Sequence, residues 1–270
     1  MRSSTNTTLS LLALAILAPL EGGGVMTFGK IGCTKIMLDW HNPYVTDGLV
    51  AMWDGQWNAG GGVHDANATL WKDLIGPNDL TVDSNVVWQD KCSFQNDWKM
   101  TAKRDNASIT WAFAEVVCDW SLIAGNSNIS ACFSAGSAAG SDLPNIYGNF
   151  NAWYNSRRTK YFCQFQANGR STKYAEIESQ VSETSYLHGT LSFDKTNQIV
   201  WRNAQQLTMQ DKDTSYLYTD ANKIYIGSNN NNNDRSFKGK FYCVRLYQSV
   251  LSSAQIAANY AIDRLRFGLT

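Results

Sequence analysis

The chain has 270 residues, and its 23 basic and 23 acidic side chains give a formal net charge of zero. An excess of Lys and Arg favours binding to nucleic acid or to an anionic membrane surface. The neutral net charge therefore gives no support to either as a partner. Charged residues make up only 17% of the chain, against roughly 25% in typical soluble proteins. Asn, Ser, Thr and Gln must therefore supply much of the polar surface.

The amino-terminal segment is open to two interpretations. Leu9–Leu20 is apolar over 12 residues, and a membrane-spanning helix needs about 20, so we predict no transmembrane span. The run is either the core of a signal peptide, with Gly22–Gly24 as a cleavage region, or a short element that docks on a partner subunit. In both cases we predict an arm over residues 1–45 and one folded domain over residues 46–270.

From Thr46 onward the chain alternates short apolar runs with turn-forming residues. The strand-like runs are GLVAMW, LWKDLI, NVVWQ, ASITWAFAEVVCDW, ISACFSA, NIYGNF, TKYFCQFQ, GTLSFD, QIVWR, KIYIGS and GKFYCVRLY. Many short strands separated by turn signals predict an all-β sandwich or barrel. Strand–helix alternation, which would indicate an α/β fold, is missing from the sequence.

One segment near the end of the chain has a helical pattern. Ser252 and Gln255 have the spacing of a capping box, apolar residues then recur at helical intervals, and Gly268 follows as a stop signal. We therefore predict a short amphipathic helix over Ser253–Arg266, directly after the last strand.

Three parts of the sequence together resemble laminin-G-like, concanavalin A-type jelly rolls. GKFYCVRLYQSVLSSAQIAANYAIDRLRFG resembles their closing strand and helix, and LHGTLSFDKTNQIVWRNAQQL resembles their mid-domain hairpin. Ala204 stands where that hairpin usually has Gly, which would strain a type I′ turn. The opening DGLVAMWDGQWNAGGGVHD and ATLWKDLIGPNDLTV resemble the first two strands, with the family's Trp-x-Asp-Leu-x-Gly step at Trp71, Asp73, Leu74 and Gly76.

This resemblance covers about Thr46 to Phe267 and implies an all-β jelly-roll β-sandwich with a short C-terminal helix and an N-terminal arm. The fold hosts lectins, glycosidases and adhesion modules, and similar domains occur in gut bacterial and bacteriophage surface proteins. We expect a non-catalytic recognition or adhesion module for a cell-surface glycan or host receptor, extracellular or on a virion. The alternative is a structural virion protein whose arm contacts other virion proteins; a glycoside hydrolase is the third interpretation.

Two stretches are the candidate ligand-binding residues. Five consecutive asparagines, Asn229, Asn230, Asn231, Asn232 and Asn233, stand between two predicted strands. Asn favours turns, so the stretch is either a solvated loop or a recognition loop whose amides bind sugar hydroxyls. Trp153 and Tyr154, in NFNAWYNSRR, are the candidate stacking platform if the fold brings that stretch close to the asparagines.

No carboxylate pattern supports catalysis. Jelly-roll glycosidases need carboxylates on one face of one strand. Glu176 and Glu178 are the nearest match, but they lack an intervening Asp, and AEIESQ has weak strand character. Glu115 and Asp119 share a strand face, yet Val117 lies between them on it. We therefore interpret Glu176 and Glu178 as part of a solvated face, assign Glu115 and Asp119 no catalytic role, and expect no enzyme.

No cofactor is expected either. The histidines at positions 41, 64 and 188 are too scattered for a metal cluster. The resemblance allows calcium at a rim, with Asp47, Asp73 and Asp79, together with Asp54 and Asn78, as oxygen ligands, but no calcium-loop spacing supports them, and we expect turn roles. The six cysteines form no CxxC pair, and we expect buried free thiols.

Overall fold

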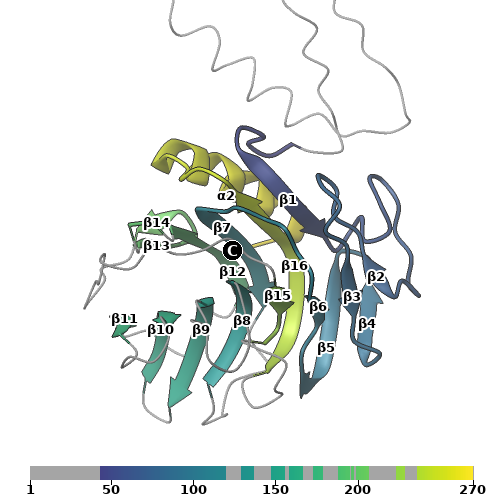
Figure 1. Ribbon diagram of the computed structural model, residues 1–270, viewed down its shortest axis with the longest axis horizontal. Helices are drawn as coiled ribbons and strands as arrows, with labels where there is room; N and C mark the ends of the chain where they lie inside the picture. The colour runs from purple at the N-terminus through teal and green to yellow at the C-terminus, as the bar shows by residue number, and fades with distance from the viewer. Residues whose placement is uncertain are drawn as a thin grey trace, which may run out of the picture. The chain divides into compact units, whose positions relative to one another are not determined.

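The computed structural model describes residues 43–119, 129–136, 147–155, 158–166, 173–178, 188–194, 196–197, 199–206, 223–228 and 236–269. All of them belong to one structural unit, Asp39–Thr270. In this part of the chain, two antiparallel sheets pack face to face, and a C-terminal helix covers one of them (Figure 1). No described helix is long and apolar enough to cross a membrane.

The first sheet, here called the helix-covered sheet, has the strand order β14-β13-β12-β7-β16-β5-β4. Strand β1 pairs with the second half of β16, on the edge whose first half pairs with β5. The described strands of this sheet are β1 (Leu49–Asp54), β4 (Val86–Gln89), β5 (Cys92–Lys99), β7 (Phe113–Asp119), β12 (His188–Asp194), β13 (Ile199–Arg202), β14 (Gln205–Gln206) and β16 (Phe237–Tyr247).

The second sheet has the strand order β11-β10-β9-β8-β15-β6-β3-β2. Neighbouring strands such as β8 and β15 are far apart in the sequence, so the chain passes repeatedly from one sheet to the other, as in a jelly roll. The described strands are β2 (Leu70–Trp71), β3 (Leu80–Val82), β6 (Ala102–Arg104), β8 (Ile129–Gly136), β9 (Tyr147–Asn155), β10 (Arg158–Gln166), β11 (Lys173–Glu178) and β15 (Lys223–Ile226).

The main core lies between the sheets and follows from the period of two along each strand. In β7, Ala114, Val116 and Cys118 belong to this core, while the residues between them face the helix. In β15 of the second sheet, Ile224 and Ile226 belong to the same core. Large aromatic side chains fill the space, and Trp53, Trp71 and Trp111 are fully buried within it.

Helix α2 (Ser253–Phe267) lies on the outer face of the helix-covered sheet (Figure 1). It begins with the predicted capping box, because the Ser252 hydroxyl accepts a bond from Gln255 N and the Gln255 side chain accepts one from Ser252 N. It ends at Gly268, whose left-handed backbone (φ 69°) suits glycine. An apolar cluster from the sheet and the helix (Phe113, Trp201, Tyr247, Leu251 and Ile256) packs beneath its first turns.

The predicted all-β jelly roll and the C-terminal helix are confirmed. Within ASITWAFAEVVCDW, the described strand is Phe113–Asp119, shorter than the predicted run. In NFNAWYNSRR, β9 continues to Asn155 and β10 begins at Arg158. AEIESQ, whose strand character is weak, contributes to β11. In the last two segments cross-strand pairing stabilises residues of low strand propensity.

The mid-domain hairpin forms the tight turn in spite of Ala204. Asn203 and Ala204 have φ of 50° and 61°, the left-handed values that a type I′ turn requires. Asn203 stabilises the turn, because its backbone N–H donates to Thr190 O and its side-chain oxygen accepts from Thr190 N, at 2.9 and 3.0 Å. A Cβ atom at position 189 would collide with that Asn203 oxygen, so Gly189 makes room for it.

Candidate functional site

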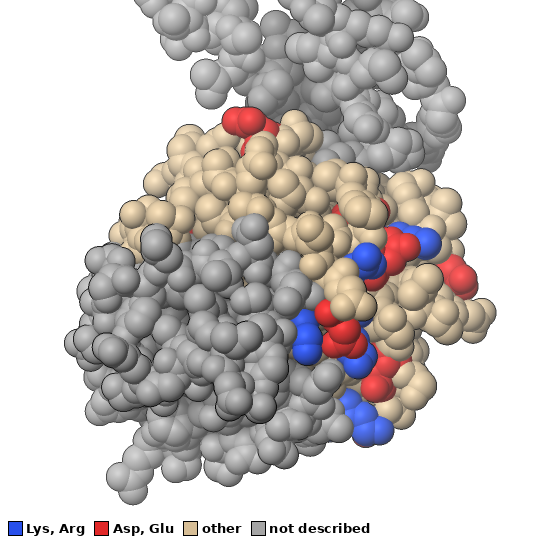
Figure 2. All heavy atoms as spheres, viewed as in Figure 1, with Lys and Arg blue, Asp and Glu red and all other residues tan. Residues whose placement is uncertain are grey.

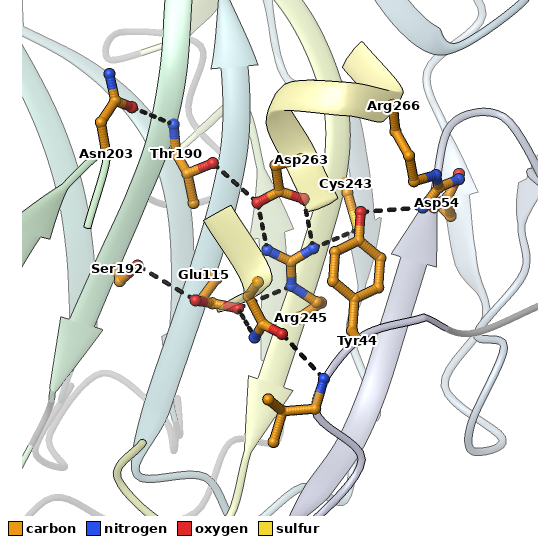
Figure 3. Close-up of polar contacts among 12 residues, drawn as sticks. Tyr44, Asp54, Glu115, Thr190, Ser192, Asn203, Cys243, Arg245, Asp263 and Arg266 are labelled. Atoms are coloured by element: carbon orange, nitrogen blue, oxygen red, sulfur yellow. Dashed lines mark hydrogen bonds and ion pairs between the residues drawn. The ribbon is translucent and has the colours of Figure 1, made fainter. Parts of the chain in front are cut away.

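Glu115, one of the candidate carboxylates, lies in a charged network between the helix-covered sheet and α2 (Figure 3). Arg245 on β16 donates from Nε to Glu115 on β7 at 2.8 Å. Its two terminal nitrogens donate to both oxygens of Asp263 on α2, at 2.8 and 2.7 Å. All three side chains are fully buried. The guanidinium therefore joins a strand carboxylate to a helix carboxylate in a bidentate geometry.

Uncharged groups complete the bonding of these acids. Asn259 on α2 donates to Glu115 at 2.7 Å, Thr190 donates to Asp263 at 2.9 Å, and the Ser192 hydroxyl lies 3.4 Å from Glu115. Buried charges are tolerated only when they are paired and hydrogen-bonded in this way. Each carboxylate is buried and already bonded to protein groups. The network therefore attaches the helix to the sheet, and we assign it no role in substrate binding.

The described residues just before β1 also contact this charged network. Tyr44 is buried, with the Arg245 guanidinium 3.9 Å from its ring centre, and its hydroxyl accepts a bond from Arg266 at 3.0 Å. Arg266 also pairs with the buried Asp54 of β1 at 2.7 Å. Val45 N donates to Asn259 at 2.9 Å. The end of the predicted arm thus contacts the domain. The rest of the arm, residues 1–42, lies outside the described residues.

Three carboxylates but only two guanidinium groups are joined in the described ion pairs between the helix and the sheet. Burial raises the pKa of Glu115, and the neighbouring Arg245 opposes this only in part. Burial likewise raises the pKa of Asp54, against the effect of Arg266. Burial acts to lower the pKa of Arg245, but Asp263 and Glu115 outweigh it and hold that pKa well above its usual value. The two arginines therefore stay charged. Holding Glu115 and Asp54 as buried carboxylates costs free energy.

The candidate calcium ligands have structural roles where their contacts are described. Both carboxylate oxygens of Asp73 accept backbone N–H bonds, from Met52, Ile75 and Asn78. Asp79 accepts from Asp73 N and forms an ion pair with Lys72 at 2.6 Å. No group of three or more metal-ligating side chains is found among the described residues. These bonds satisfy backbone N–H groups in and near the turn between β2 and β3. Asp47 lies in the turn before β1.

The charged side chains on the described surface are mixed in sign. Figure 2 shows basic and acidic residues side by side near strands β2 to β6. Two of the pairs are Lys72–Asp79 and Lys103–Asp105, the latter at 3.0 Å. A surface that interleaves both signs does not build the one-sided field by which proteins attract nucleic acid.

The face of the second sheet that points away from the core carries polar residues in continuous register. Tyr225 stands between the core residues Ile224 and Ile226 and is therefore on this outer face. Cross-strand partners share a face, and the row through Tyr225 reads Thr81, Lys103, Tyr225, Ser134, Asn149, Gln164 and Tyr174, from β3 to β11. Tyr225 and Ser134 are almost completely buried, whereas Thr81 is exposed.

Two further rows cross the last three strands on the same face. Because the β9–β10 and β10–β11 pairings have no bulge, residues two apart along each strand stay on one face. One row contains Asn151, Phe162 and Glu176, and the next contains Trp153, Lys160 and Glu178. Positions on the opposite, core-side face are mainly apolar: Phe150, Ala152, Tyr154, Tyr161, Cys163, Phe165, Ala175 and Ile177.

The register separates the two predicted stacking residues. Trp153 is on the outer face, and Tyr154, its neighbour in β9, falls on the core-side face. The two residues therefore occupy positions on opposite faces of β9, and their assignment as ligand-binding residues stays a prediction. Glu176 and Glu178 share the outer face with Trp153, as their spacing predicted.

The five asparagines, Asn229–Asn233, lie outside the described residues, but the stem of their loop is described. Phe237 N donates to Gly227 O at 2.8 Å, and Gly227 N donates to Cys132 O at 2.9 Å. Ile226 aligns with Phe133 and Phe150, so β15 ends on the side of the sheet toward which β9 runs to Trp153. From Ile226, Trp153 is two strands across the sheet, which is about 10 Å. It is also three residues further along the strand direction than Phe150, which is again about 10 Å.

A family model for the concanavalin A-like lectin/glucanases superfamily matches residues 117–257, just over half of the chain. The chain belongs to this superfamily. A search of curated proteins finds no match.

Solved structures share the fold of this superfamily member at low identity. A Trypanosoma rangeli sialidase in complex with sialic acid superposes with a TM-score of 0.56 at 16% identity, and its covalent difluorosialic acid intermediate with 0.56 at 14%. Both matches cover 81% of this chain and 33% of the sialidase, so the chain spans about a third of that enzyme. A Ruminococcus gnavus IT-sialidase CBM40 bound to sialyllactose has a TM-score of 0.41 at 10% identity, covering 58% of this chain and 97% of the module.

Sequence reasoning missed the charged network and the role of Tyr44. Glu115, Arg245 and Asp263 are separated by 130 and 18 residues, and the sequence does not reveal such distant pairs. One signal was available: Arg245 interrupts the apolar run of β16, and Asp263 stands among the helix positions that face the sheet. A charge within a buried pattern usually has a charged partner.

Proposed function

We propose that this protein is a non-catalytic glycan-binding module whose site is the outer face of β9, β10 and β11. The observation that carries the proposal is the register, which gathers amide, aromatic and charged positions there and leaves the apolar positions on the other face. Amides donate and accept bonds to sugar hydroxyls, and aromatic rings offer a flat apolar surface to the C–H face of a sugar. Membership of a superfamily that contains lectins supports this function.

The direction of β15 supports placing the site at this end of the sheet. β15 ends on the side of the sheet toward which β9 runs to Trp153. Asn229–Asn233 follow β15 in the chain and are therefore tested together with the sheet face.

A glycan array tests the proposal, followed by titration of each bound glycan against variants. Replacing Trp153 by Ala should weaken binding by about tenfold or more, because burial of an aromatic side chain is worth roughly 1.5–3 kcal/mol. Thr81→Ala, on the same sheet face but in β3, is the matched control and should bind like the wild type. Binding that survives Trp153→Ala, or no binding to any glycan, would refute the proposal.

The asparagine loop is tested separately. Replacing Asn229–Asn233 together by Ser should weaken binding roughly tenfold or more if two or three amides bind sugar, at about 0.5–1.5 kcal/mol each. The melting temperature should not change if these residues form the solvated loop that the sequence predicts. Unchanged binding would remove the loop from the site while leaving the sheet face in place.

Glycoside hydrolysis is the second candidate, because the superfamily includes glucanases and β11 places Glu176 and Glu178 on one face. We assign these residues a different role. β11 stands at one edge of the described second sheet, where charges discourage edge-to-edge association, and Lys160 stands opposite Glu178 in register. Release of reducing ends from a bound polysaccharide, lost in Glu176→Gln or Glu178→Gln, would establish the enzyme instead.

We further propose display on a virion or bacterial cell surface, with the arm over residues 1–45 serving export or contact with other virion proteins. The low proportion of charged residues and the apolar Leu9–Leu20 run support this. Mass spectrometry of purified virions and of washed cell surfaces should detect the chain in one of them. Detection in neither would contradict it. The sialic acid of the sialidase structures does not transfer to this chain, but sialylated glycans belong on the array.

A further inference from the structure

The ion pairs between α2 and the helix-covered sheet contain one carboxylate more than they contain cations. Among the described side chains, Glu115, Asp263 and Asp54 are paired there with Arg245 and Arg266. Four of these five side chains are fully buried, and Arg266 is nearly so. With every group ionised, the buried network would have a net negative charge. A buried acid without a cation of its own takes up a proton instead, so the count of charges predicts that one of the three acids is neutral.

The hydrogen bonds identify the acid that lacks a cation of its own. Asp263 accepts from both terminal nitrogens of Arg245, at 2.8 and 2.7 Å. Asp54 accepts from Arg266 at 2.7 Å, and this arginine forms no other ion pair in the described part of the chain. Glu115 accepts only from Nε of Arg245, the cation that Asp263 also uses. Glu115 is therefore the acid that takes up the proton.

One oxygen of Glu115 has room for that proton. Oε2 accepts from Arg245 at 2.8 Å and from Asn259 at 2.7 Å, whereas the described partner of Oε1 is the Ser192 hydroxyl, 3.4 Å away. A hydroxyl accepts hydrogen bonds as well as donating them. A proton on Oε1 can therefore be donated to Ser192 while both bonds at Oε2 are kept. Burial favours this neutral form, since it raises the pKa of Glu115 against the opposing charge of Arg245.

The same site is connected to the residues just before β1. Asn259, which donates to Glu115, accepts a bond from Val45 N at 2.9 Å. The ring of Tyr44 packs on the guanidinium of Arg245, which lies 3.9 Å from the ring centre (Figure 3). The helix and the segment before β1 thus meet the sheet through one network, and a change of charge at Glu115 acts on both.

We propose that this network is a proton-operated latch: Glu115 holds a proton in the folded protein, and loss of that proton at higher pH loosens α2 and residues 43–45 from the sheet. Without the proton, Arg245 is shared between two ionised carboxylates and the network has an uncompensated buried charge. Water then replaces protein groups around the acids, and this requires the helix and the segment to move away from the sheet.

The groups around Glu115 leave the titration to this residue. Besides the five ion-paired side chains, the titratable groups that line the network are the buried Cys243 and Tyr247 of β16 and Tyr44. Burial raises the pKa of each of the three, so they stay neutral. β12 contributes the neutral Thr190 and Ser192. The next charged positions in register, Asp119 on β7 and His188 on β12, pair with each other four residues along β7 from Glu115.

The direction of the effect follows from proton linkage. The closed latch binds the proton more tightly than the open one, in which Glu115 returns to its ordinary pKa of 4.5. The contribution to stability is complete below that pH. Above it, the equilibrium constant for opening rises by up to about tenfold for each pH unit, until the pH passes the raised pKa of Glu115.

Infrared spectroscopy of the full chain with isotope-labelled glutamate tests where the proton is. At pH 6, where an ordinary glutamate is ionised, the wild type should show the carbonyl band of one protonated glutamate, and Glu115→Gln should lack it. Ser192→Ala removes the partner of Oε1 and should shift this band, which keeps the assignment testable if Glu115→Gln does not fold. No band, a band that persists in Glu115→Gln, or a band that Ser192→Ala leaves unshifted would overturn the proposal.

Hydrogen–deuterium exchange between pH 5 and pH 8 tests the latch itself. After correction for the intrinsic exchange rate, peptides that cover residues 43–45 and α2 should open more readily as the pH rises, by up to about tenfold per unit relative to Glu115→Gln. The histidines are present in both proteins, so their titration cancels in this comparison. Asp90→Asn, in the exposed turn between β4 and β5, is the matched control and should keep the pH dependence of the wild type.

Two results of the exchange measurement would refute the latch. The first is an equal pH dependence of opening in the wild type and in Glu115→Gln, even where the infrared band is present. The second is an increase in exchange at high pH that is as large in β2, β3 and β4 as in α2, because the effect would then be a loss of stability of the whole domain.

Discussion

Arg245 is the residue on which the attachment of α2 to the sheet depends most. Its guanidinium is fully buried and bonds two carboxylates, one on β7 and one on the helix. Arg245→Leu would leave Glu115 and Asp263 buried without a cation, which costs about 3–5 kcal/mol in comparable cases. Denaturant unfolding should show this loss, whereas Arg264→Leu, at an exposed helix position, should change stability by less than about 0.5 kcal/mol. A loss below about 1 kcal/mol for Arg245→Leu would contradict the account.

Glu115 makes stability depend on pH in a direction that the structure fixes. Burial raises its pKa above the ordinary value of 4.5, in a site where Arg245, Asp263 and Asn259 face it. The folded protein therefore binds more protons than the unfolded chain above pH 4.5, and stability from this group falls as pH rises through the raised pKa.

The test compares the free energy of unfolding of the wild type with that of Glu115→Gln from pH 8 down to pH 4.5. The glutamine does not titrate, so the stability of the wild type relative to the variant should increase as the pH is lowered. Unfolding free energies measured in urea at each pH check this. A relative stability that decreases toward low pH would show that the ion pair with Arg245 outweighs burial.

At the scale of elements, the β13–β14 hairpin keeps a turn that its sequence disfavours. Ala204 has φ of 61°, and an alanine in the left-handed region costs about 1–2 kcal/mol. Ala204→Gly should therefore stabilise the protein, by up to about 1 kcal/mol, since loss of the partly buried methyl offsets part of the gain. A rise in the melting temperature would confirm this, and a fall would show that packing against Trp201 and its neighbours matters more.

The elements could be predicted where local pattern and tertiary context agree. The capping box of Ser252 and Gln255 located the start of α2, and Gly268 located its end, because both signals act within one turn of helix. β9 and β11 could not be predicted fully, because Asn-rich and Glu-containing segments have low strand propensity and become strands through their neighbours.

The candidate site was predictable only in part for a related reason. Aromatic and amide residues in NFNAWYNSRR are visible in the sequence, and Trp153 stays a predicted site residue. The faces are assigned by register, which places Trp153 and Tyr154 at positions on opposite faces of β9 and puts positions of β10 and β11 on the face of Trp153. Register depends on long-range pairing that a single sequence does not reveal.

At the scale of the whole molecule, the boundary between arm and domain is the testable feature. The division into residues 1–45 and 46–270 stays a prediction, but Tyr44 and Val45 contact the domain. A chain without residues 1–42 should fold cooperatively. Removal of residues 43–45 as well should lower stability by several kcal/mol, through loss of a buried aromatic ring, its contact with Arg245 and a hydrogen bond. Equal melting temperatures for the two truncations would contradict this role of Tyr44.

The claim that the outer face of β9–β11 binds glycan is tested most directly by hydrogen–deuterium exchange of the full chain with and without a saturating polysaccharide taken from the array. Ligand should slow exchange in peptides that cover residues 147–178 and leave those of β2, β3 and β4 unchanged. Such a pattern would place the ligand on the proposed face. Protection at β2–β4 or around α2, with unchanged exchange over residues 147–178, would contradict the account.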